Sequence, residues 1–561
     1  MSLNTDPVWS TWNPWSFIRE QYNLGVDLTT EQVRRGHGSR VALYWENADG
    51  DSRSVTYREL DELSTRFAAA LQWRGVRRED RVFLRLPNIP EFYVAALGVA
   101  KLGGVFIPSS TQFRASEVQY RLRDSGAVAV VASADLLEAV EEAAPHCPDL
   151  KHIVVVRYPD REARVPVYED FEKLVQEDST HDGCPWIPAS TRHDDMAFLA
   201  YTSGTTGDPK GVLHYQRYPL AYEGLVRYWH DYRQDDVVAC PSEMGWLLPV
   251  ASTFLYALSR GLTVVLFDAM RRRFDPLVWL RLFQQYRITN FTASPTVYRM
   301  LMMAADRAAE FDLSSWRHAV TAGEPLPADT FQAIRRAFGV SARDGIGMSE
   351  CMVYCFNSID LPIRAGSCGR PGPGTVIELM DEHLYPVPPE TEGVLCLRRD
   401  SHPGMMKEYW NKPRQTAEIF RGAWYVSGDV LRRDDDGYFW FQGRADDLIK
   451  ASGYRISPFE VESCLCSHPA VLEAAAVPSP DPLRGTIVKA FIVLRPNVAA
   501  TDTLAEELQH HVRERIAPYK HPRQIEFVTE LPKTTSGKIK RRELRTASAP
   551  QATPARSAVA Q

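Results

Sequence analysis

Apolar and polar positions along the first third of the chain follow two alternating periods. Short β-type runs at 41–45 and 54–57 lead into residues 57–76, where apolar side chains recur at helical spacing until a stop at Gly75. The same rhythm continues in runs at 81–87 (strand), 91–104 (helix), 105–110 (strand), 117–127, 128–133 (strand), 136–144 (helix) and 152–157 (strand). Strands that alternate with helices predict an α/β body built on a largely parallel sheet.

A change of composition at residues 440–456 (WFQGRADDLIKASGYRI) indicates a second domain. The stretch that follows has a small βα pattern of its own and ends in a tail rich in Ala, Pro, Ser and Gln. We therefore expect a large N-terminal domain over residues 1–443 and a small α+β domain over 447–545, joined by 444–446. The tail, 546–561, has no apolar period and is predicted to be disordered.

The composition is typical of an ordinary globular protein. The 561 residues exceed the length at which single cores stop growing, and the net charge of −6 gives no argument for nucleic acid or anionic membranes. The N-terminus lacks the segments of a secretory signal, and apolar runs such as 246–258 are shorter than the roughly 18–20 residues that span a bilayer. The nine cysteines include no CxxC pair, so we expect free thiols and a cytoplasmic protein.

The N-terminal segment carries Trp9, Trp12, Trp15 and Phe17 close together. Large aromatic side chains of this kind are expected to pack against the body of the protein. A partner-binding role for the segment is the less favoured alternative.

The segment Tyr201–Gly211 (YTSGTTGDPKG) combines glycines and hydroxyls with one lysine. Glycines let the backbone approach a polyanion, hydroxyls can donate to phosphate oxygens, and a lysine adds a positive charge. The spacing differs from that of the P-loop NTPases, and a plain surface loop is the alternative. The apolar run at 196–200 favours a phosphate loop held between structured elements. Its residues are Thr202, Ser203, Gly204, Thr205, Thr206, Gly207 and Lys210.

Three strand ends are expected to line one cleft, because ligands of open α/β sheets sit beyond the carboxyl ends of the strands. They are the end of the run into the phosphate loop, HAVTAGEP at 318–325 and GIGMSE at 345–350.

Six segments in this order resemble the signature motifs of the adenylate-forming superfamily, which includes acyl-CoA synthetases, peptide-synthetase adenylation domains and firefly luciferase. They are Tyr201–Gly211, TAGEPL at 321–326, DGIGMSE at 344–350, YVSGDV at 425–430, GRADDLIKASGYRI at 443–456 and LPKTTSGKIKRREL at 531–544. The phrases SPTVYRML and APYKHPRQIEF look most like the medium-chain acyl-CoA synthetases, and DGIGMSE resembles the benzoate-CoA ligases. The resemblance implies the adenylate-forming fold with a mobile small domain.

The implied reaction joins a carboxylate to ATP, giving acyl-AMP and pyrophosphate, and then to the CoA thiol, giving acyl-CoA and AMP. ATP, Mg²⁺ and coenzyme A are the implied cofactors. In-line displacement at the α-phosphorus needs positioned positive charge rather than a nucleophilic triad. The resemblance gives Glu350 to Mg²⁺, Lys538 and Thr202 to catalysis, and Asp429 to the ribose. The other nucleotide contacts are Gly323, Glu324, Pro325, Asp344, Gly345, Ile346, Gly347, Met348, Ser349, Phe441, Arg444 and Arg455, beside the phosphate loop.

Two half-reactions at one site imply a domain movement. In the family the small domain rotates about the hinge acid, here Asp446 within 444–446, so that the segment around Gly453 replaces the lysine loop. From motif position and charge, the expected CoA contacts are Ser452, Gly453, Tyr454, Arg484 and Lys520.

The size of the acid is expected to depend on Gly347, three residues before Glu350, where acetate-specific relatives carry a tryptophan. Glycine there favours an acid larger than acetate. Medium-chain fatty, aromatic and alicyclic carboxylates all stay open, because one methylene in an apolar pocket discriminates by only about 1–3 kcal/mol. The expected pocket walls are Trp246, Leu248, Val250 and Val353.

Two alternatives compete with a CoA ligase. One is an adenylation enzyme that loads a carrier protein, although no carrier domain follows in this chain. The other is a non-catalytic nucleotide-binding homologue. The intact set of motif residues argues against it: Lys210, Glu350, Asp429 and Lys538. Oligomeric state is not indicated by the sequence.

Overall fold

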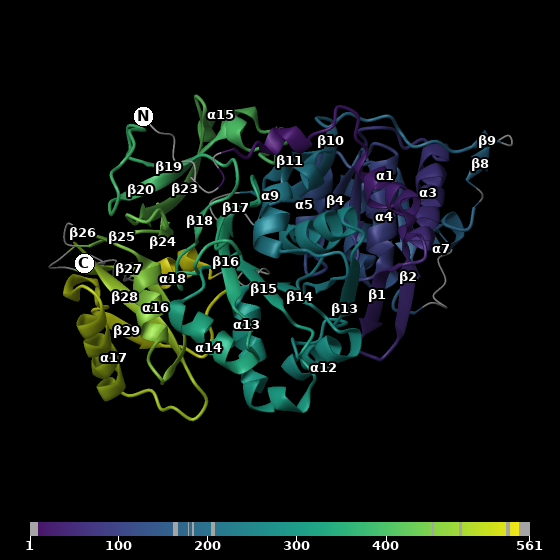
Figure 1. Ribbon diagram of the computed structural model, residues 1–561. Coiled ribbons are helices and arrows are strands. Elements are labelled where there is room, and N and C mark those ends of the chain that lie inside the picture. Colours follow the sequence, from purple (N-terminus) through teal and green to yellow (C-terminus); the bar gives the residue numbers. More distant parts are fainter. Residues whose placement is uncertain are drawn as a thin grey trace, which may run out of the picture. The chain divides into compact units, whose positions relative to one another are not determined.

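The computed structural model describes residues 9, 11–160, 167–177, 179–181, 184–202, 208–445, 447–451, 454–481, 485–533 and 539–548. The chain forms two compact units (Figure 1). Unit 1 comprises 1–378, 396–426 and 436–439, and unit 2 comprises 379–395, 427–435 and 440–561. The predicted boundary after residue 443 lies near the start of the long continuous part of unit 2, and two shorter parts of this unit come from earlier in the chain.

A nine-stranded sheet organises one half of unit 1. Its order is β18-β17-β16-β15-β14-β12-β13-β1-β2, and the pairs from β16 through β1 are parallel. The edge strands β2, β17 and β18 pair antiparallel. The bounds are β1 Val41–Asn47, β2 Ser52–Thr56, β12 Val237–Ala239, β13 Thr263–Asp268, β14 Asn290–Ala293, β15 His318–Ala322, β16 Ala342–Gly347, β17 Val353–Phe356 and β18 Arg370–Pro371.

An eight-stranded sheet, in the order β21-β11-β10-β4-β3-β5-β6-β7, organises the other half of unit 1. The pairs from β10 through β7 are parallel, and β11 and β21 add two antiparallel strands. The prediction of mainly parallel sheets is therefore confirmed. The bounds are β3 Arg81–Arg85, β4 Val105–Pro108, β5 Ala129–Ser133, β6 His152–Val156, β7 Glu169–Asp170, β10 Met196–Tyr201, β11 Gly211–Tyr215 and β21 Glu408–Tyr409.

The first long helix of unit 1 begins and ends where the sequence pattern indicates. Helix α3 (Tyr57–Trp73) starts with a capping box between Thr56 and Glu59 and ends just before Gly75, whose φ of 89° suits glycine. Further long helices are α4 Pro90–Lys101, α5 Ala115–Ser125, α12 Pro276–Tyr286, α13 Pro295–Leu301 and α14 Ala328–Phe338.

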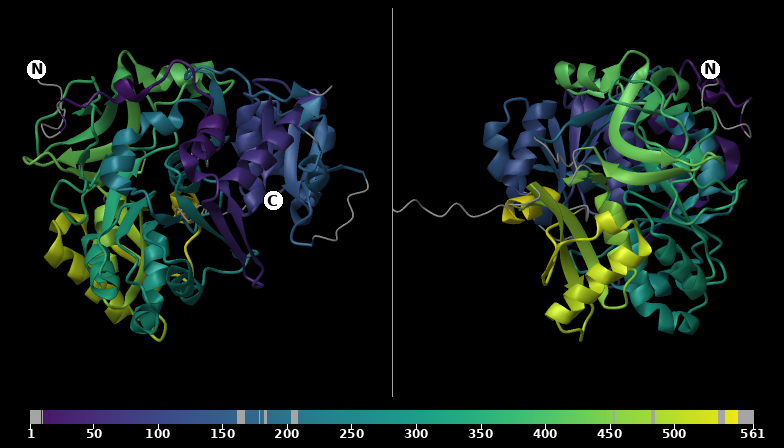
Figure 2. Two further views of the ribbon diagram at one scale, coloured as in Figure 1. Left: turned by 45° about the vertical axis from the view of Figure 1, so that its right-hand side comes forward. Right: turned by 90° about the vertical axis from the view of Figure 1, so that its left-hand side faces the viewer.

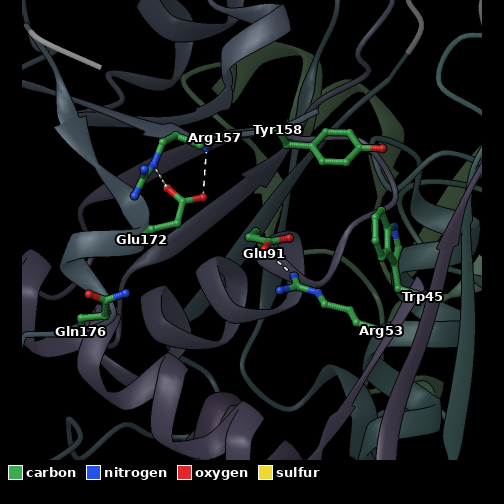
Figure 3. A pocket seen from close by; sticks show the side chains of 7 residues that line it. All are labelled: Trp45, Arg53, Glu91, Arg157, Tyr158, Glu172 and Gln176. Atoms are coloured by element: carbon green, nitrogen blue, oxygen red, sulfur yellow. Dashed lines mark hydrogen bonds and ion pairs between the residues drawn. The ribbon is translucent and has the colours of Figure 1, made fainter. Parts of the chain in front are cut away.

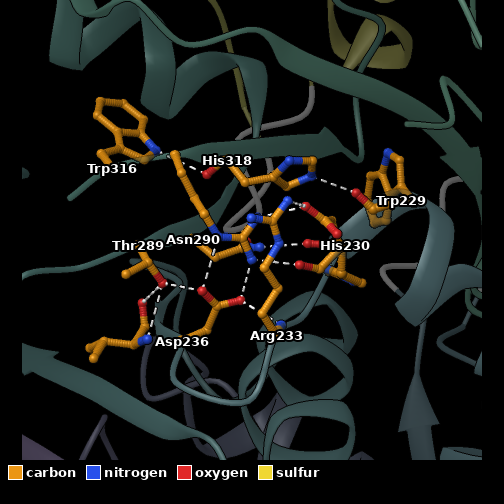
Figure 4. A network of polar contacts seen from close by, with 11 residues as sticks. Trp229, His230, Arg233, Asp236, Thr289, Asn290, Trp316 and His318 are labelled. Atoms are coloured by element: carbon orange, nitrogen blue, oxygen red, sulfur yellow. Dashed lines mark hydrogen bonds and ion pairs between the residues drawn. The ribbon is translucent and has the colours of Figure 1, made fainter. Parts of the chain in front are cut away.

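A polar network ties together the starts of three neighbouring parallel strands of the nine-stranded sheet (Figure 4). Arg317, just before β15, forms ion pairs with Asp231 and with Asp236 just before β12. Thr289, just before β14, donates to Asp236 at 2.7 Å. The network therefore joins the amino ends of these strands. The predicted cleft lies at their opposite, carboxyl ends.

The N-terminal aromatic segment packs on unit 1, as predicted. The Trp9 ring lies 5.4 Å from that of Tyr228 and 6.4 Å from that of Phe356, and Trp9 is 6% exposed. The Trp12 ring lies 5.6 Å from Tyr228, and Trp15 donates from its indole nitrogen to the Asp400 carbonyl.

Unit 2 contains a three-stranded sheet, β27-β28-β29, with β27 and β28 antiparallel and β28 and β29 parallel (Figure 2). A core that includes Val461, Leu465, Ile492 and Leu508 packs helices α16 and α17 on this sheet. The prediction of a small α+β domain is confirmed. The bounds are β25 Ile449–Ala451, β26 Tyr454–Ile456, α16 Pro458–Cys466, β27 Val471–Asp481, β28 Gly485–Leu494, α17 Asp502–Arg515, β29 Gln524–Phe527 and α18 Arg541–Ser548.

Among the described residues, none of the helices combines the length and apolar character that a bilayer crossing requires.

Candidate active site

The predicted phosphate loop is the connection of a β-hairpin. Strands β10 and β11 pair antiparallel with Tyr201 opposite Gly211. At the base of the loop, the Thr202 N–H donates to the Lys210 carbonyl at 3.0 Å, and the Lys210 N–H donates to the Thr202 hydroxyl oxygen at 3.3 Å. The prediction of a loop held between structured elements is confirmed, while Ser203 to Gly207 lie outside the described residues.

Helix α5 anchors this base from one side. The Tyr120 hydroxyl donates to the Pro209 carbonyl at 2.9 Å, and the Tyr201 hydroxyl donates to the Asp124 carboxylate at 2.8 Å. Burial and the charge of Asp124 raise the pKa of Tyr201, so this phenol stays a donor. The stem of the hairpin is therefore fixed on the body of unit 1.

Glu350 lies beside this stem because β21 pairs with β11, placing Tyr409 opposite Val212. The Tyr409 hydroxyl donates to the Glu350 carboxylate, and the Lys210 ammonium lies 4.8 Å from the centre of the Tyr409 ring. The Met406 N–H also donates to the Glu350 carbonyl at 2.7 Å. The structure thus brings together Thr202, Lys210 and Glu350.

The acidic motif has a second attachment to the hairpin. His214 on β11 is buried and donates from Nε2 to the Ser349 carbonyl at 2.9 Å. Burial lowers the pKa of His214 to about 3, so the ring is neutral at ordinary pH. Sequence reasoning missed both His214 and Tyr409.

The segments predicted to contact adenine meet at the carboxyl ends of the parallel strands β15 and β16. The buried Asp344 carboxylate accepts from the N–H groups of Leu326 at 3.1 Å and Gly345 at 2.9 Å, which holds the Gly323–Glu324–Pro325 turn against β16. Burial raises the pKa of Asp344 to about 8. Glu324 accepts from Thr296 at 2.7 Å and from Arg299 at 3.1 Å. Ile346 and Met348 continue the same segment.

The structure gives Gly347 a role that the sequence did not suggest. A Cβ on this residue would lie 2.3 Å from the carbonyl oxygen of Met352 and 2.6 Å from the backbone nitrogen of Val353. The chain doubles back so closely that only glycine fits without movement of the backbone. The interpretation of Gly347 as an open pocket floor stays a prediction.

The expected acyl-pocket walls occupy different environments. Val353 and Val250 are buried core residues, whereas Trp246 and Leu248 are partly exposed. The Trp246 ring lies 6.3 Å from that of Phe113, and Gly245 beside it packs directly against the Ser109–Ser110 backbone. Their role as pocket walls stays a prediction.

A cavity of about 220 Å³ lies elsewhere in unit 1, between side chains from β1, β2, α4 and the end of β6 (Figure 3). Its arginines already have partners, because Arg53 pairs with Glu91 and Arg157 pairs with Glu172. It contains none of the predicted site residues.

Unit 2 holds the predicted ribose carboxylate in an ion pair. Arg444 donates to the buried Asp429 at 2.9 Å, and the Asp429 N–H donates to the Ser427 hydroxyl oxygen at 3.0 Å. The Phe441 ring packs 6.0 Å from that of Phe459. The structure therefore brings two predicted nucleotide contacts, Asp429 and Arg444, into direct contact.

The predicted CoA contacts are only partly described. Lys520 donates to Glu460 at 2.6 Å, so its charge is paired in this structure. Tyr454 and Arg455 lie on β26, where Arg455 is opposite Lys450. The hinge and lysine-loop residues, with the remaining CoA contacts, lie outside the described residues: Asp446, Ser452, Gly453, Arg484 and Lys538.

Comparisons with known proteins identify the family to which the chain belongs. Residues 30–410 match the family model described as AMP-binding enzyme, and residues 460–538 match the AMP-binding enzyme C-terminal domain. The mitochondrial acyl-coenzyme A synthetase ACSM3 of Mus musculus is 37% identical over 538 residues, covering 94% of this chain and 91% of that protein.

Two solved structures are also similar. The anthranilate CoA ligase AuaEII in complex with anthranoyl-AMP has a TM-score of 0.86 and 32% identity, covering 95% of this chain and 98% of that one. A benzoate CoA ligase from Burkholderia xenovorans LB400 has a TM-score of 0.81 and 31% identity, covering 93% and 100%.

The chain belongs to the AMP-binding enzyme family and has the adenylate-forming fold. Within that class it is an AMP-forming acyl-CoA synthetase, as the sequence motifs indicated.

Proposed function

We propose that this enzyme activates a carboxylic acid larger than acetate with ATP and Mg²⁺, and then transfers the acyl group to coenzyme A. The observation that carries the proposal is the contact of both Lys210 and Glu350 with Tyr409 at the stem of the hairpin, where the Lys210 N–H also donates to the Thr202 hydroxyl. This arrangement supplies a hydroxyl, a cation and a carboxylate at the base of a glycine-rich loop.

Lys210 and the loop before it suit the binding of a nucleoside triphosphate. Lys210 brings a positive charge to the end of the loop, and its ring contact with Tyr409 leaves the ammonium without a carboxylate partner among the described residues. The loop that it ends would bind the β- and γ-phosphates, which leave as pyrophosphate. Positioned charge of this kind lowers the barrier to displacement at phosphorus.

The residues also fit a magnesium ion bound through a single carboxylate. In the described part of the chain, no group of three or more His, Cys, Asp or Glu residues could hold a metal by itself. Mg²⁺ commonly binds through one or two carboxylates together with substrate phosphates. Glu350 would be that ligand, since only one of its oxygens accepts the Tyr409 hydroxyl within the described residues. When bound, the ion would neutralise phosphate charge.

Unit 2 carries motifs that the proposal uses in both half-reactions. Lys538 would neutralise charge on the carboxylate and α-phosphate during adenylation. Rotation about Asp446 would then bring the segment around Gly453 to the acyl-adenylate, with CoA as acceptor. Residues at the ends of elements often serve as such hinges.

The relatives, together with the sequence motifs, support an order among the candidate acids. Anthranilate and benzoate CoA ligases are among the similar structures, and the ACSM3 protein is an acyl-coenzyme A synthetase. We therefore place aromatic and medium-chain carboxylates first for this enzyme, with alicyclic acids next.

A cytoplasmic location is part of the same proposal, supported by cysteines that are free thiols in the described residues.

Acid-dependent exchange of labelled pyrophosphate into ATP, measured without CoA, tests the first half-reaction. We expect exchange with an aromatic or medium-chain acid and much less with acetate. Exchange that does not depend on any acid would contradict adenylation of a carboxylate. Loss of exchange in Glu350→Gln, with retained folding, would support the metal-ligand role of this residue.

A further inference from the structure

Tyr409 contacts two charged residues of the proposed site, the carboxylate of Glu350 and the ammonium of Lys210. Its hydroxyl donates to Glu350, and its ring face lies 4.8 Å from the Lys210 ammonium. Lys210 and Glu350 themselves form no ion pair in the described part of the chain. A single side chain thus contacts both the cation and the anion.

This separation has a chemical consequence. A direct ion pair between Lys210 and Glu350 would compensate the lysine charge needed for phosphate and the carboxylate charge needed for a metal. A ring face attracts an ammonium more weakly than a carboxylate does. The Lys210 ammonium can therefore leave the ring and bind a phosphate. A phenol fixes the direction of a carboxylate and leaves its negative charge in place.

The backbone around Tyr409 is held firmly on the hairpin. The Lys407 N–H donates to the Leu213 carbonyl and the Trp410 N–H donates to the Gly211 carbonyl, both at 2.8 Å. The Tyr409 N–H also donates to the Thr416 hydroxyl at 3.0 Å, and the residue is 4% exposed. These bonds therefore fix the position of the ring relative to the hairpin stem.

We propose that Tyr409 is a positioning residue for the metal–nucleotide complex: its hydroxyl orients Glu350 for Mg²⁺, and its ring holds Lys210 away from that carboxylate. This inference rests on the proposed function and adds a residue to it. The phenol acts through Glu350, and no bond to it forms or breaks in the reaction.

Calorimetry with a non-hydrolysable ATP analogue tests the proposal without turnover. The affinity is measured with Mg²⁺ and with EDTA, and the ratio of the two is the metal dependence of binding. In Tyr409→Phe the ring remains and only the hydroxyl is lost. We expect the ratio to fall about tenfold, because a hydrogen bond to a charged group is lost, while affinity in EDTA stays unchanged.

A matched control removes another phenol that donates to a glutamate away from the proposed site. Tyr286 donates at 3.0 Å to Glu46 on β1, which lies five strands away from β16 in the nine-stranded sheet, so Tyr286→Phe should leave the ratio unchanged. Tyr409→Phe should also have no further effect on the ratio when Glu350→Gln is already present, because the hydroxyl acts through that carboxylate.

The ring contact is tested by Tyr409→Leu. This variant should lose affinity in EDTA as well, because Lys210 can then pair with Glu350. Equal affinity of Tyr409→Leu and Tyr409→Phe in EDTA would overturn the role of the ring. An unchanged ratio in Tyr409→Phe, or an equal fall in the Glu350→Gln background, would overturn the role of the hydroxyl. Absence of analogue binding by the unaltered enzyme would instead overturn the proposed function itself.

Discussion

His214 donates a hydrogen bond from Nε2 to the carbonyl of Ser349, 2.9 Å away and 135 positions later in the chain. The bond attaches the segment before Glu350 to the hairpin that ends in the phosphate loop. Because the imidazole is buried, its pKa falls to about 3. The histidine that makes this attachment is therefore neutral at ordinary pH, since burial outweighs the hydrogen bond to Ser349, which favours the charged ring.

Buried neutral histidines predict a loss of stability in acid. Burial lowers the pKa to about 3 for His214 and to about 4 for His318 and His402, below the value near 6.5 expected in the unfolded chain. Their stabilisation is therefore present above pH 6.5 and is lost as the pH falls toward the folded values. Each should cost about 1 kcal/mol per pH unit between pH 6.5 and 4.

Thermal unfolding between pH 4 and 7 measures this effect. His214→Gln should be less stable at pH 7, because the bond to Ser349 is weakened, and should show a shallower pH dependence than the unaltered protein. Curves of equal slope would contradict a neutral buried His214.

Gly347→Ala tests the close approach of the chain at the acidic motif. The added methyl would lie 2.3 Å from the Met352 carbonyl oxygen, so the backbone must shift. We expect a loss of about 1–3 kcal/mol in the free energy of unfolding, together with weaker Mg-ATP binding. Wild-type stability and nucleotide affinity in this variant would show that the turn has more room than the structure gives it.

The sequence was sufficient for elements that it specifies locally. The strands β3, β4 and β5 are continuous apolar runs, and α3 has a capping box before it and Gly75 after it, so each could be predicted. The apolar runs on both sides of the phosphate loop predicted a loop held between structured elements, and the structure shows that these elements are the antiparallel strands β10 and β11. These elements depend on residues that are close together in the chain, so the pattern of apolar and polar residues predicts them.

The contacts that complete the site depend on how strands pair and turn, across both long and short separations in the chain. Tyr409 lies on a strand of two residues and meets Glu350 across 59 positions, so no local pattern marks it. Gly347 was interpreted as a pocket feature from its place in the family motif, and the structure adds a close approach to the backbone of Met352 that the motif did not indicate. Pairing between strands, rather than periodicity, decides both.

Lys538→Ala separates the two half-reactions. Removing the cation should lower adenylation about 100-fold or more, since a positioned charge on the transferring group is lost. Conversion of supplied acyl-AMP and CoA to acyl-CoA should continue at near the normal rate. Release of pyrophosphate at the wild-type rate would exclude this assignment of the lysine.

Asp446→Pro should have the opposite effect. A proline at the hinge restricts φ and hinders the rotation required before CoA attacks. Adenylation should stay measurable while formation of the thioester from acyl-AMP falls sharply. An equal loss of both half-reactions would argue against a hinge at this residue.

The central claim, ligation of a medium-sized acid to CoA through an adenylate, is tested most directly by following pyrophosphate and AMP in one assay. The purified protein is incubated with Mg-ATP and a panel of acetate, medium-chain, aromatic and alicyclic acids, with and without CoA. We predict that pyrophosphate release depends on an acid larger than acetate, and that sustained AMP release requires CoA. Sustained AMP release without CoA, or no acid-dependent pyrophosphate with any member of the panel, would contradict the account.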